Sequence, residues 1–240
     1  MISGYPVTEF TPITLVECLL ANRTVRRKRV LFFANTNFVV KCRSLTERFF
    51  NDDVLIVNDG LGMDVACILL YGRKFKSNLN GTDFMPYFFS HAKPQLRVFL
   101  IGGTGKALNG AADYIVDTFG HKVVGRCNGY DDIKKTENLI DIINDASADV
   151  VLVALGNSWQ EEWIMNSYSQ VNAKFFVGVG GLFDFWSGDK PRAPKWVQSI
   201  RMEWFYRLLL EPKRLYKRYT LDALKFLVSC IKYRNSACKK

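Results

Sequence analysis

Short apolar runs alternate with longer amphipathic segments along the chain. Five of these runs have the length of β-strands and are apolar at almost every position: residues 30–34, 54–57, 98–101, 150–155 and 175–179. Strands of this kind are buried on both faces, and the segments between them are long enough for crossover helices. The pattern predicts an α/β fold with a Rossmann-like, mainly parallel sheet, helices on both faces and right-handed connections.

Small and polar residues follow each run. They are Asn35 and Asn37, then Asn58, Asp59 and Gly60, then Gly102 and Gly103, then Gln160 and Glu161, and finally Gly180 and Asp184. Ligands of such folds bind outside the carboxyl ends of the strands, where glycines and helix N-termini can approach phosphate. Each loop alone is ordinary for a strand-to-helix turn, but five at one edge of the sheet predict a binding site.

Asp59 directly follows the second run and precedes a helix that we expect to begin near Gly62. A carboxylate at this place can remove a proton from a hydroxyl group if burial raises its pKa. Alternatively, its side chain caps the following helix. The residues alone leave both interpretations open. Asp184, which lies between two phenylalanines, is expected to anchor a loop by hydrogen bonds to the backbone.

Several enzyme classes are excluded by residue spacing. The segment 102–106 reads GGTGK, which lacks the order of a nucleotide-hydrolase P-loop and of the GxGxxG dinucleotide motif. Neither of the two histidines, His91 and His121, lies near a GxSxG nucleophile elbow. No acidic pair of the kind that holds a nucleotide-sugar metal follows a strand, and the six cysteines form no CxxC pair. We therefore predict no metal, no cofactor and no disulfide.

The basic charge is concentrated near the end of the chain. Of the net charge of +10 over 240 residues, +9 comes from residues 195–240, which hold twelve Lys or Arg and three Asp or Glu. We therefore predict a Rossmann-like catalytic domain over residues 1–190 and a basic helical appendage over 191–240. Such an appendage suits an anionic partner, which is a phosphorylated ligand, a lipid surface or nucleic acid.

The appendage predicts two amphipathic helices separated by Pro212. In the second, one face carries Leu221, Leu224, Leu227, Val228 and Ile231, with basic residues on its flank. This pattern is typical of a helix that lies among lipid headgroups, and the alternative is a helix packed on the domain. The apolar face argues against nucleic acid as a partner. The chain shows neither a signal-peptide pattern nor a membrane-spanning run, so we expect a peripheral protein at the cytoplasmic face of the membrane.

The arginines of the appendage are candidates for a second role. A guanidinium group can bind a diphosphate through two parallel hydrogen bonds, which lysine does not offer. The candidates are Arg192, Arg201, Arg207, Arg214 and Arg218.

Seven motifs together resemble the WecG/TagA/CpsF glycosyltransferases over roughly residues 30–220. They are NDGxG at 58–62, NGTD at 80–83, GG at 102–103, GxxxQE at 156–161, GVGGxFD at 178–184, RAPK at 192–195 and EWxxRLxxEPxR at 203–214. The resemblance implies transfer of a sugar from a UDP-sugar to an undecaprenyl-diphosphate-linked saccharide on the bacterial cytoplasmic membrane, without a required metal ion. It also implies that the appendage docks on the membrane and completes the active site.

Carried over to this sequence, the resemblance makes Asp59 the general base and Gln160, Asn80 and Asp83 residues of the substrate pocket. It assigns the UDP diphosphate to Arg192, Arg207, Arg214 and Arg218.

Asn78 stands where the family usually has an arginine, Trp159 where lysine is common, and Asn35 where a threonine is usual. These departures favour the branch that adds glucose in xanthan-like exopolysaccharide assembly. The alternatives are transfer of N-acetylmannosamine or its uronic acid, and a membrane-peripheral or nucleic-acid-binding protein without catalysis. The sequence leaves self-association open.

Overall fold

Six parallel strands form one sheet in the computed structural model, which describes residues 1–21, 27–130, 133 and 136–237. The order across the sheet is β2-β1-β6-β5-β3-β4, and every neighbouring pair is parallel. The strands are β1 (Arg29–Ala34), β2 (Val54–Asn58), β3 (Arg97–Gly102), β4 (Lys122–Cys127), β5 (Val150–Ala154) and β6 (Phe175–Gly178). The predicted α/β, Rossmann-like fold is confirmed.

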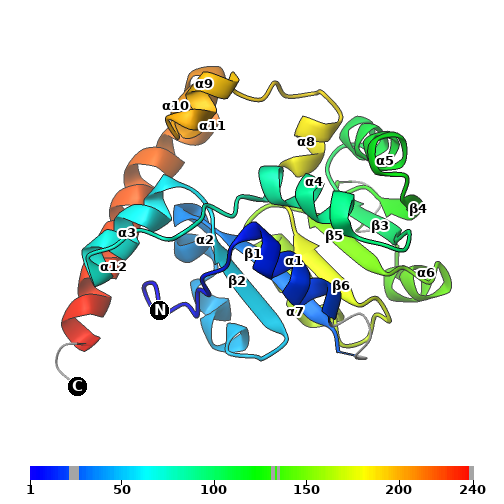
Figure 1. Cartoon of the computed structure of the whole chain (residues 1–240), viewed down its shortest axis with the longest axis horizontal. Coiled ribbons are helices and arrows are strands. Elements are labelled where there is room, and N and C mark those ends of the chain that lie inside the picture. The colour runs from blue at the N-terminus through cyan, green and yellow to red at the C-terminus, as the bar shows by residue number, and fades with distance from the viewer. Residues whose placement is uncertain (22–26, 131–132, 134–135, 238–240) are drawn as a thin grey trace.

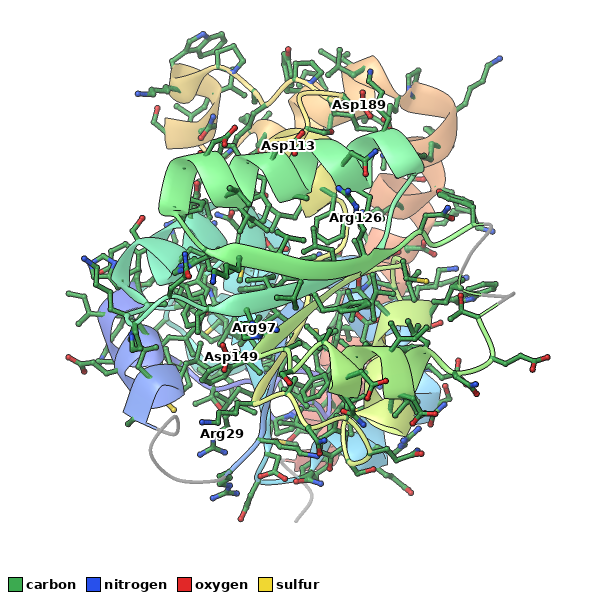
Figure 2. All side chains as sticks on the ribbon, turned by 90° about the vertical axis from the view of Figure 1, so that its right-hand side faces the viewer. Arg29, Arg97, Asp113, Arg126, Asp149 and Asp189 are labelled. Atoms are coloured by element: carbon green, nitrogen blue, oxygen red, sulfur yellow. The ribbon has the colours of Figure 1, made fainter. Side chains whose placement is uncertain are left out.

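The sheet separates two hydrophobic cores. In β1, Val30, Phe32 and Ala34 face one core, whereas Leu31 and Phe33 face the other, as the two-residue period of a strand requires. This explains why the strands read as continuous apolar runs. Figure 2 shows helices on both sides of the sheet.

The helices divide between the two cores. One core includes α1 (Pro12–Ala21), α4 (Gly81–His91), α5 (Gly105–Phe119) and α8 (Leu182–Trp186). The other includes α2 (Thr36–Lys41), η1 (Arg43–Phe49), α3 (Leu61–Tyr71), α6 (Leu139–Asp145), α7 (Trp159–Ser167) and α12 (Ala223–Ala237). Because all six strands are parallel, the loops that follow them lie together at one edge of the sheet.

The appendage is a succession of helices that leaves the domain and returns to it (Figure 1). It contains α9 (Lys195–Ser199), α10 (Glu203–Leu210), α11 (Pro212–Lys217), a π-helical turn η2 (Arg218–Asp222) and α12. Pro212 occupies the first position of α11, where its missing N–H costs nothing. The predicted break between two helices is therefore confirmed.

Helix α12 packs against α2 and α3 and has two apolar faces. Phe226 and Cys230 are buried in the core, whereas Leu221, Leu224, Val228 and Ile231 are exposed. Leu227 was predicted on the exposed face, but it packs partly buried against the core. Among the described helices, none combines the length and the apolar character that crossing a bilayer requires.

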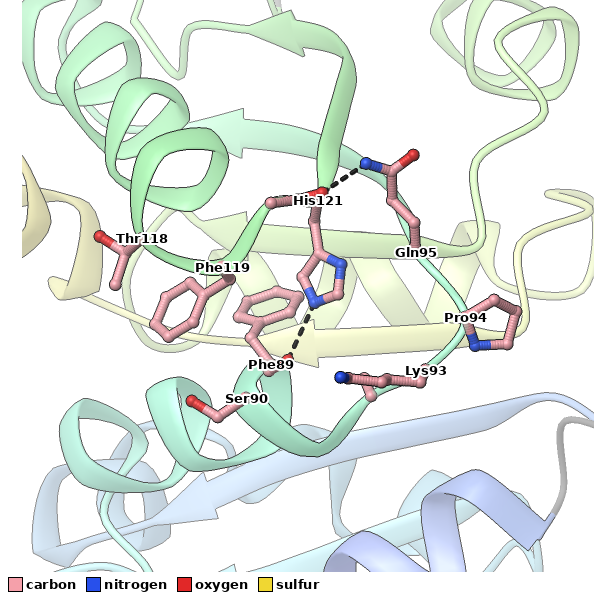
Figure 3. Close-up of a pocket in the computed structure, with 10 residues that line it drawn as sticks. Phe89, Ser90, Lys93, Pro94, Gln95, Thr118, Phe119 and His121 are labelled. Atoms are coloured by element: carbon pink, nitrogen blue, oxygen red, sulfur yellow. Dashed lines mark hydrogen bonds between the residues drawn. The ribbon is translucent and has the colours of Figure 1, made fainter.

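The opposite, amino-terminal edge of the sheet is closed by structural contacts. Arg97, at the start of β3, donates its backbone N–H to Asp149 Oδ2 at 2.9 Å, and both residues are labelled in Figure 2. A hollow of about 440 Å³ opens nearby between segments 89–95 and 118–121 (Figure 3). In it, His121 Nδ1 accepts the Leu96 N–H at 3.2 Å, so its Nε2 carries the proton and donates to the Phe89 carbonyl at 3.0 Å. Both ring nitrogens are thus engaged, and His121 serves the fold.

Candidate active site

Asp59 lies at the carboxyl end of β2, beside the carboxyl end of β1. Its backbone N–H donates to the Ala34 carbonyl at 2.7 Å, which extends the β1–β2 ladder by one bond. Asn35 caps α2 by accepting the Phe38 N–H at 3.1 Å and, with its Nδ2, donates to Asp59 Oδ2 at 3.1 Å. The cap of α2 therefore fixes an amide donor against the Asp59 carboxylate.

The alternative that Asp59 caps α3 is wrong. The residue at the cap position is Gly60, whose φ of +88° is a conformation that glycine adopts without strain. No side-chain hydrogen bond caps this helix within the described part of the chain. The Asp59 carboxylate is therefore directed to Asn35 instead of the helix N-terminus.

Two asparagines hold the loop before α4 against Asp59. Asn78 Oδ1 accepts the Gly60 N–H at 2.7 Å, and Asn58 Nδ2 donates to the Ser77 carbonyl at 2.7 Å. Asn58 is fully buried, and its Oδ1 has no hydrogen-bond partner among the described residues. The structure thus brings Asn35, Asn58, Gly60 and Asn78 to Asp59, as the sequence predicts.

The pKa of Asp59 is raised above its ordinary value. Burial is the largest cause, because it disfavours the charged carboxylate. The hydrogen bond from Asn35 and the charges of Arg218 and Arg207 oppose this shift, and the charge of Glu203 adds to it. The raised pKa makes the Asp59 carboxylate a stronger base than an exposed one, and Asn35 holds it in place; both properties suit a general base.

Arg207 and Arg218 bring positive charge from the appendage to Asp59. The Arg207 guanidinium lies 5.3 Å from the centre of the Phe185 ring, and Arg218 lies 5.6 Å from that of Tyr219. Burial lowers the pKa of Arg218, and its Nε is buried without a hydrogen-bond partner in the described structure. A buried donor without an acceptor is costly unless a ligand completes it. Arg218 is therefore well suited to bind an anion.

The other predicted anion-binding arginines have protein partners. Arg214 pairs with Glu211 through its Nε and Nη2. Arg192 pairs with Asp83 at 2.6 Å and with Glu203 at 3.5 Å. Asp83, predicted in the substrate pocket, also accepts the Asn80 Nδ2 at 2.7 Å, while Asn80 caps α4. Arg192 therefore joins Glu203 of the appendage to the N-terminus of α4, where Asn80 and Asp83 lie.

Lys190, at the end of the domain, pairs with Asp184 in the domain and with Glu211 in the appendage. The Asp184 carboxylate lies 2.7 Å from Lys190 Nζ, and Glu211 lies 3.1 Å from the same nitrogen. The sequence predicts that Asp184 anchors a loop by hydrogen bonds to the backbone. In the described structure its carboxylate pairs instead with the Lys190 side chain.

Gln160 and Glu161 form a buried network behind the loops of β5 and β6. Glu161 Oε1 accepts from Gln160 Nε2 at 2.7 Å and from Asn157 Nδ2 at 2.9 Å, while Gln160 Oε1 accepts the Gly180 N–H at 3.0 Å. Asn37 joins through a 2.9 Å bond to Asn157 Oδ1. Glu161 is fully buried, which raises its pKa. In this structure Gln160 and Glu161 support the loops from within, and the polar surface of the network comes from Asn37 and Asn157.

Gly102 and Gly103 make the turn between β3 and α5. At Gly102, φ is +107°, and a Cβ atom would lie 2.3 Å from the Ala154 carbonyl oxygen, so only glycine fits. Gly103 has a φ of +68°. The glycines therefore allow the chain to pass closely over β5 at the edge where Asp59 also lies.

The geometry combines a general-base candidate with cationic groups from a separate segment. The model of the glycosyl transferase WecG/TagA/CpsF family matches residues 1–240. The chain belongs to this family. It is therefore a glycosyltransferase by descent, and the family resemblance expected from the motifs is confirmed.

Two curated relatives carry the same name, N-acetylglucosaminyldiphosphoundecaprenol N-acetyl-beta-D-mannosaminyltransferase. The one from Bacillus subtilis (strain 168) is 33% identical over 177 residues, which are 71% of this chain and 68% of the relative. The one from Bacillus spizizenii (strain ATCC 23059 / NRRL B-14472 / W23) is 30% identical over 186 residues, which are 77% of this chain and 70% of the relative. Their names describe N-acetylmannosaminyl transfer, so they favour the alternative over the predicted glucosyl branch.

Proposed function

We propose that this glycosyltransferase moves N-acetylmannosamine from a UDP donor to an N-acetylglucosamine that is linked to undecaprenyl diphosphate. Two relatives, 33% identical over 177 residues and 30% identical over 186 residues, bear the name of this activity. The observation that carries the chemical part of the proposal is the Asp59 carboxylate. It is held by Asn35, its pKa is raised by burial, and the charges of Arg207 and Arg218 reach it.

The reaction is a single displacement. Asp59 takes the proton of an acceptor hydroxyl while that oxygen forms a bond to the anomeric carbon of the donor sugar. The bond between the anomeric carbon and the diphosphate oxygen breaks, and its electron pair leaves with UDP. Because attack and departure occur on opposite faces of the sugar, the configuration at the anomeric carbon is inverted.

The leaving diphosphate acquires negative charge as its bond to the sugar breaks. Arg218 and Arg207 are the groups to which we assign its stabilisation, because both lie close enough to Asp59 to change its pKa. Arg218 is held there by η2, which packs against α2, the helix that Asn35 caps. Preorganised donors of this kind are among the largest contributors to catalysis. Arg192 and Arg214, which have protein partners, fit a role in holding the appendage in place.

The appendage also offers a surface for the membrane that carries the lipid acceptor. Leu221 of η2 and Leu224, Val228 and Ile231 of α12 are exposed. Helix α12 itself packs against α3 (Figure 1). Helix α3 presents an apolar stripe of its own, made by Leu61, Val65, Ile68 and Tyr71. Lys225 and Lys232 of α12 are also exposed, and apolar residues with basic neighbours favour an anionic lipid surface. We therefore place the protein peripherally at the cytoplasmic face of the bacterial membrane.

A donor panel tests the proposal. The protein is incubated with a short-chain lipid-diphosphate N-acetylglucosamine and, in separate reactions, with UDP-N-acetylmannosamine, UDP-N-acetylmannosaminuronic acid, UDP-glucose and UDP-N-acetylglucosamine. We expect UDP release and a disaccharide product with UDP-N-acetylmannosamine. If UDP-glucose is the only donor that gives product, the protein belongs to the glucosyl branch. If no donor gives product, a scaffold role without catalysis is favoured.

A further inference from the structure

The turn between α9 and α10 contains an arginine where helices usually place glycine. The Arg201 N–H donates to the Gln198 carbonyl at 2.9 Å, and the Met202 N–H donates to the Val197 carbonyl at 3.0 Å. These two bonds define a helix-ending motif whose left-handed position is commonly glycine. Arg201 occupies that position with a φ of +60°, a conformation that a residue with a side chain rarely adopts. The local backbone therefore does not explain the arginine.

The contacts of the Arg201 side chain explain why an arginine stands at this position. The Arg201 guanidinium forms an ion pair with Asp64 of α3. The Asp64 side chain is only 3% exposed, so water cannot replace the arginine as its partner. The Arg201 side chain is itself 46% exposed, so the two members of the pair differ. Removing Arg201 leaves the buried Asp64 carboxylate without its partner, which is more costly than losing an ion pair between two exposed groups. By contrast, the Asp83 side chain, which pairs with Arg192, is 56% exposed.

The ion pair joins two segments that carry reacting groups. Asp64 lies in the first turn of α3, five residues after Asp59, and Arg201 lies two residues before α10, which carries Arg207. We propose that the Asp64–Arg201 ion pair is a latch that positions α10, and with it Arg207, at Asp59. The roles of Arg207 and Asp59 rest on the proposed function, whereas the mechanical role of the latch can be tested without it.

Hydrogen exchange measured by mass spectrometry tests the latch in the full-length protein. Three variants are compared with the wild type: Arg201→Ala, Asp64→Asn and the double variant Asp64→Asn/Arg201→Ala. Arg73→Ala is the matched control, because Arg73 follows the same helix α3 and forms an exposed ion pair with Glu9, away from the appendage.

We expect amide exchange in α10 and α11 to increase about tenfold or more in Arg201→Ala and in the double variant. Exchange in β1 and β5 should stay unchanged, and Arg73→Ala should match the wild type throughout. With donor and acceptor present, turnover should fall in the same two variants at nearly constant acceptor KM. Arg201→Lys should recover only part of the protection, because it keeps the charge and loses the planar group.

Two results would contradict the proposal that the Asp64–Arg201 ion pair positions α10. One is wild-type exchange of α10 and α11 in Arg201→Ala. The other is recovery of wild-type exchange and turnover in the double variant, since this would show that the unpaired Asp64 charge, and not the lost connection, causes the effect of Arg201→Ala. If the wild type transfers no sugar, the proposed function fails, but the exchange data still decide on the latch.

Discussion

Arg218 and Arg214 lie on neighbouring turns of the appendage, and the structure predicts very different effects when each is replaced. Arg218 has a buried Nε that no acceptor reaches in the described residues, and its charge acts on Asp59. Arg214 is exposed, and its Nε and Nη2 are already bonded to Glu211. Of these two arginines, Arg218 is thus the one that can bind a diphosphate without first breaking an ion pair among the described residues.

The expected loss of kcat differs between the two arginines for this reason. Removing one preorganised donor from the developing charge of a transition state costs about 2.7–4 kcal/mol, or roughly 10²–10³-fold in kcat. We expect Arg218→Ala to lie in this range, because the Arg218 Nε is already buried in the folded protein. Arg214→Ala should lower kcat by less than about tenfold, or roughly 1.4 kcal/mol. Arg218→Lys should recover part of the loss, since it keeps the charge without the two parallel donors.

The assay is steady-state UDP release with a soluble short-chain acceptor, which makes turnover independent of membrane binding. Thermal unfolding of each variant serves as the control for folding. Nearly normal turnover in Arg218→Ala, or an equal loss in both alanine variants, would refute the assignment of the diphosphate to Arg218.

Three further predictions concern charge, membrane and stability. Because the proposed mechanism assigns the positive charge at the leaving group to arginines, turnover should survive excess EDTA, and a loss that Mg²⁺ or Mn²⁺ restores would reveal a metal requirement. The double variant Leu224→Glu/Val228→Glu alters exposed side chains only. Its sedimentation with anionic liposomes should therefore fall, while its melting temperature and its turnover of a soluble acceptor stay constant. Unchanged sedimentation would show that these residues are not part of the surface that docks on the membrane. The raised pKa of Asp59 means that its folded-state contribution to stability is present at acidic pH and lost as pH rises through that pKa. Asp59→Asn should therefore melt at a higher temperature than the wild type at pH 7–8, by roughly 2–4 °C for each kcal/mol gained in the free energy of unfolding. The difference should vanish near pH 4. An equal or lower melting temperature of the variant at pH 8 would contradict the raised pKa of Asp59.

Five strands of the sheet were predictable because each is buried on both faces and reads as an apolar run. The sixth, β4, was not among the predicted strands. It lies at the edge of the sheet, begins with the exposed Lys122 and includes the exposed Arg126, and in it only Cys127 is buried. Its strand conformation comes from pairing with β3, a tertiary contact that leaves no apolar run in the sequence.

The place of Asp59 was predictable from the geometry of parallel sheets, but its role was not. Whether it caps α3 depends on the backbone of Gly60, which no residue pattern reveals. The partners of the other acids were also hidden. Asp83 and Arg192 are 109 residues apart, and Asp64 and Arg201 are 137 residues apart, so no local spacing connects them. The one available signal for Asp64 is its position next to Met63 on the buried side of an amphipathic helix.

The orientation of α12 shows a different limit. This helix has one apolar face with Leu224, Val228 and Ile231 and another with Phe226 and Cys230. Hydrophobic periodicity detects both faces and cannot tell which one meets the domain. The choice is made by α2 and α3, whose side chains Phe38, Met63 and Ala66 share the core with Phe226. Truncating the chain before Leu221 would remove part of this core together with the exposed face, so point substitutions are the better test of docking.

The central claim is that Asp59 is the general base of a sugar transfer, and the turnover of Asp59→Asn tests it most directly. Turnover is measured with UDP-N-acetylmannosamine and a soluble lipid-diphosphate N-acetylglucosamine, and UDP affinity is measured on the same sample by calorimetry. We expect turnover to fall roughly 10²–10⁴-fold while UDP affinity changes little, because asparagine keeps the shape of the site and cannot accept the proton. Turnover close to that of the wild type, with UDP still bound, would contradict the account.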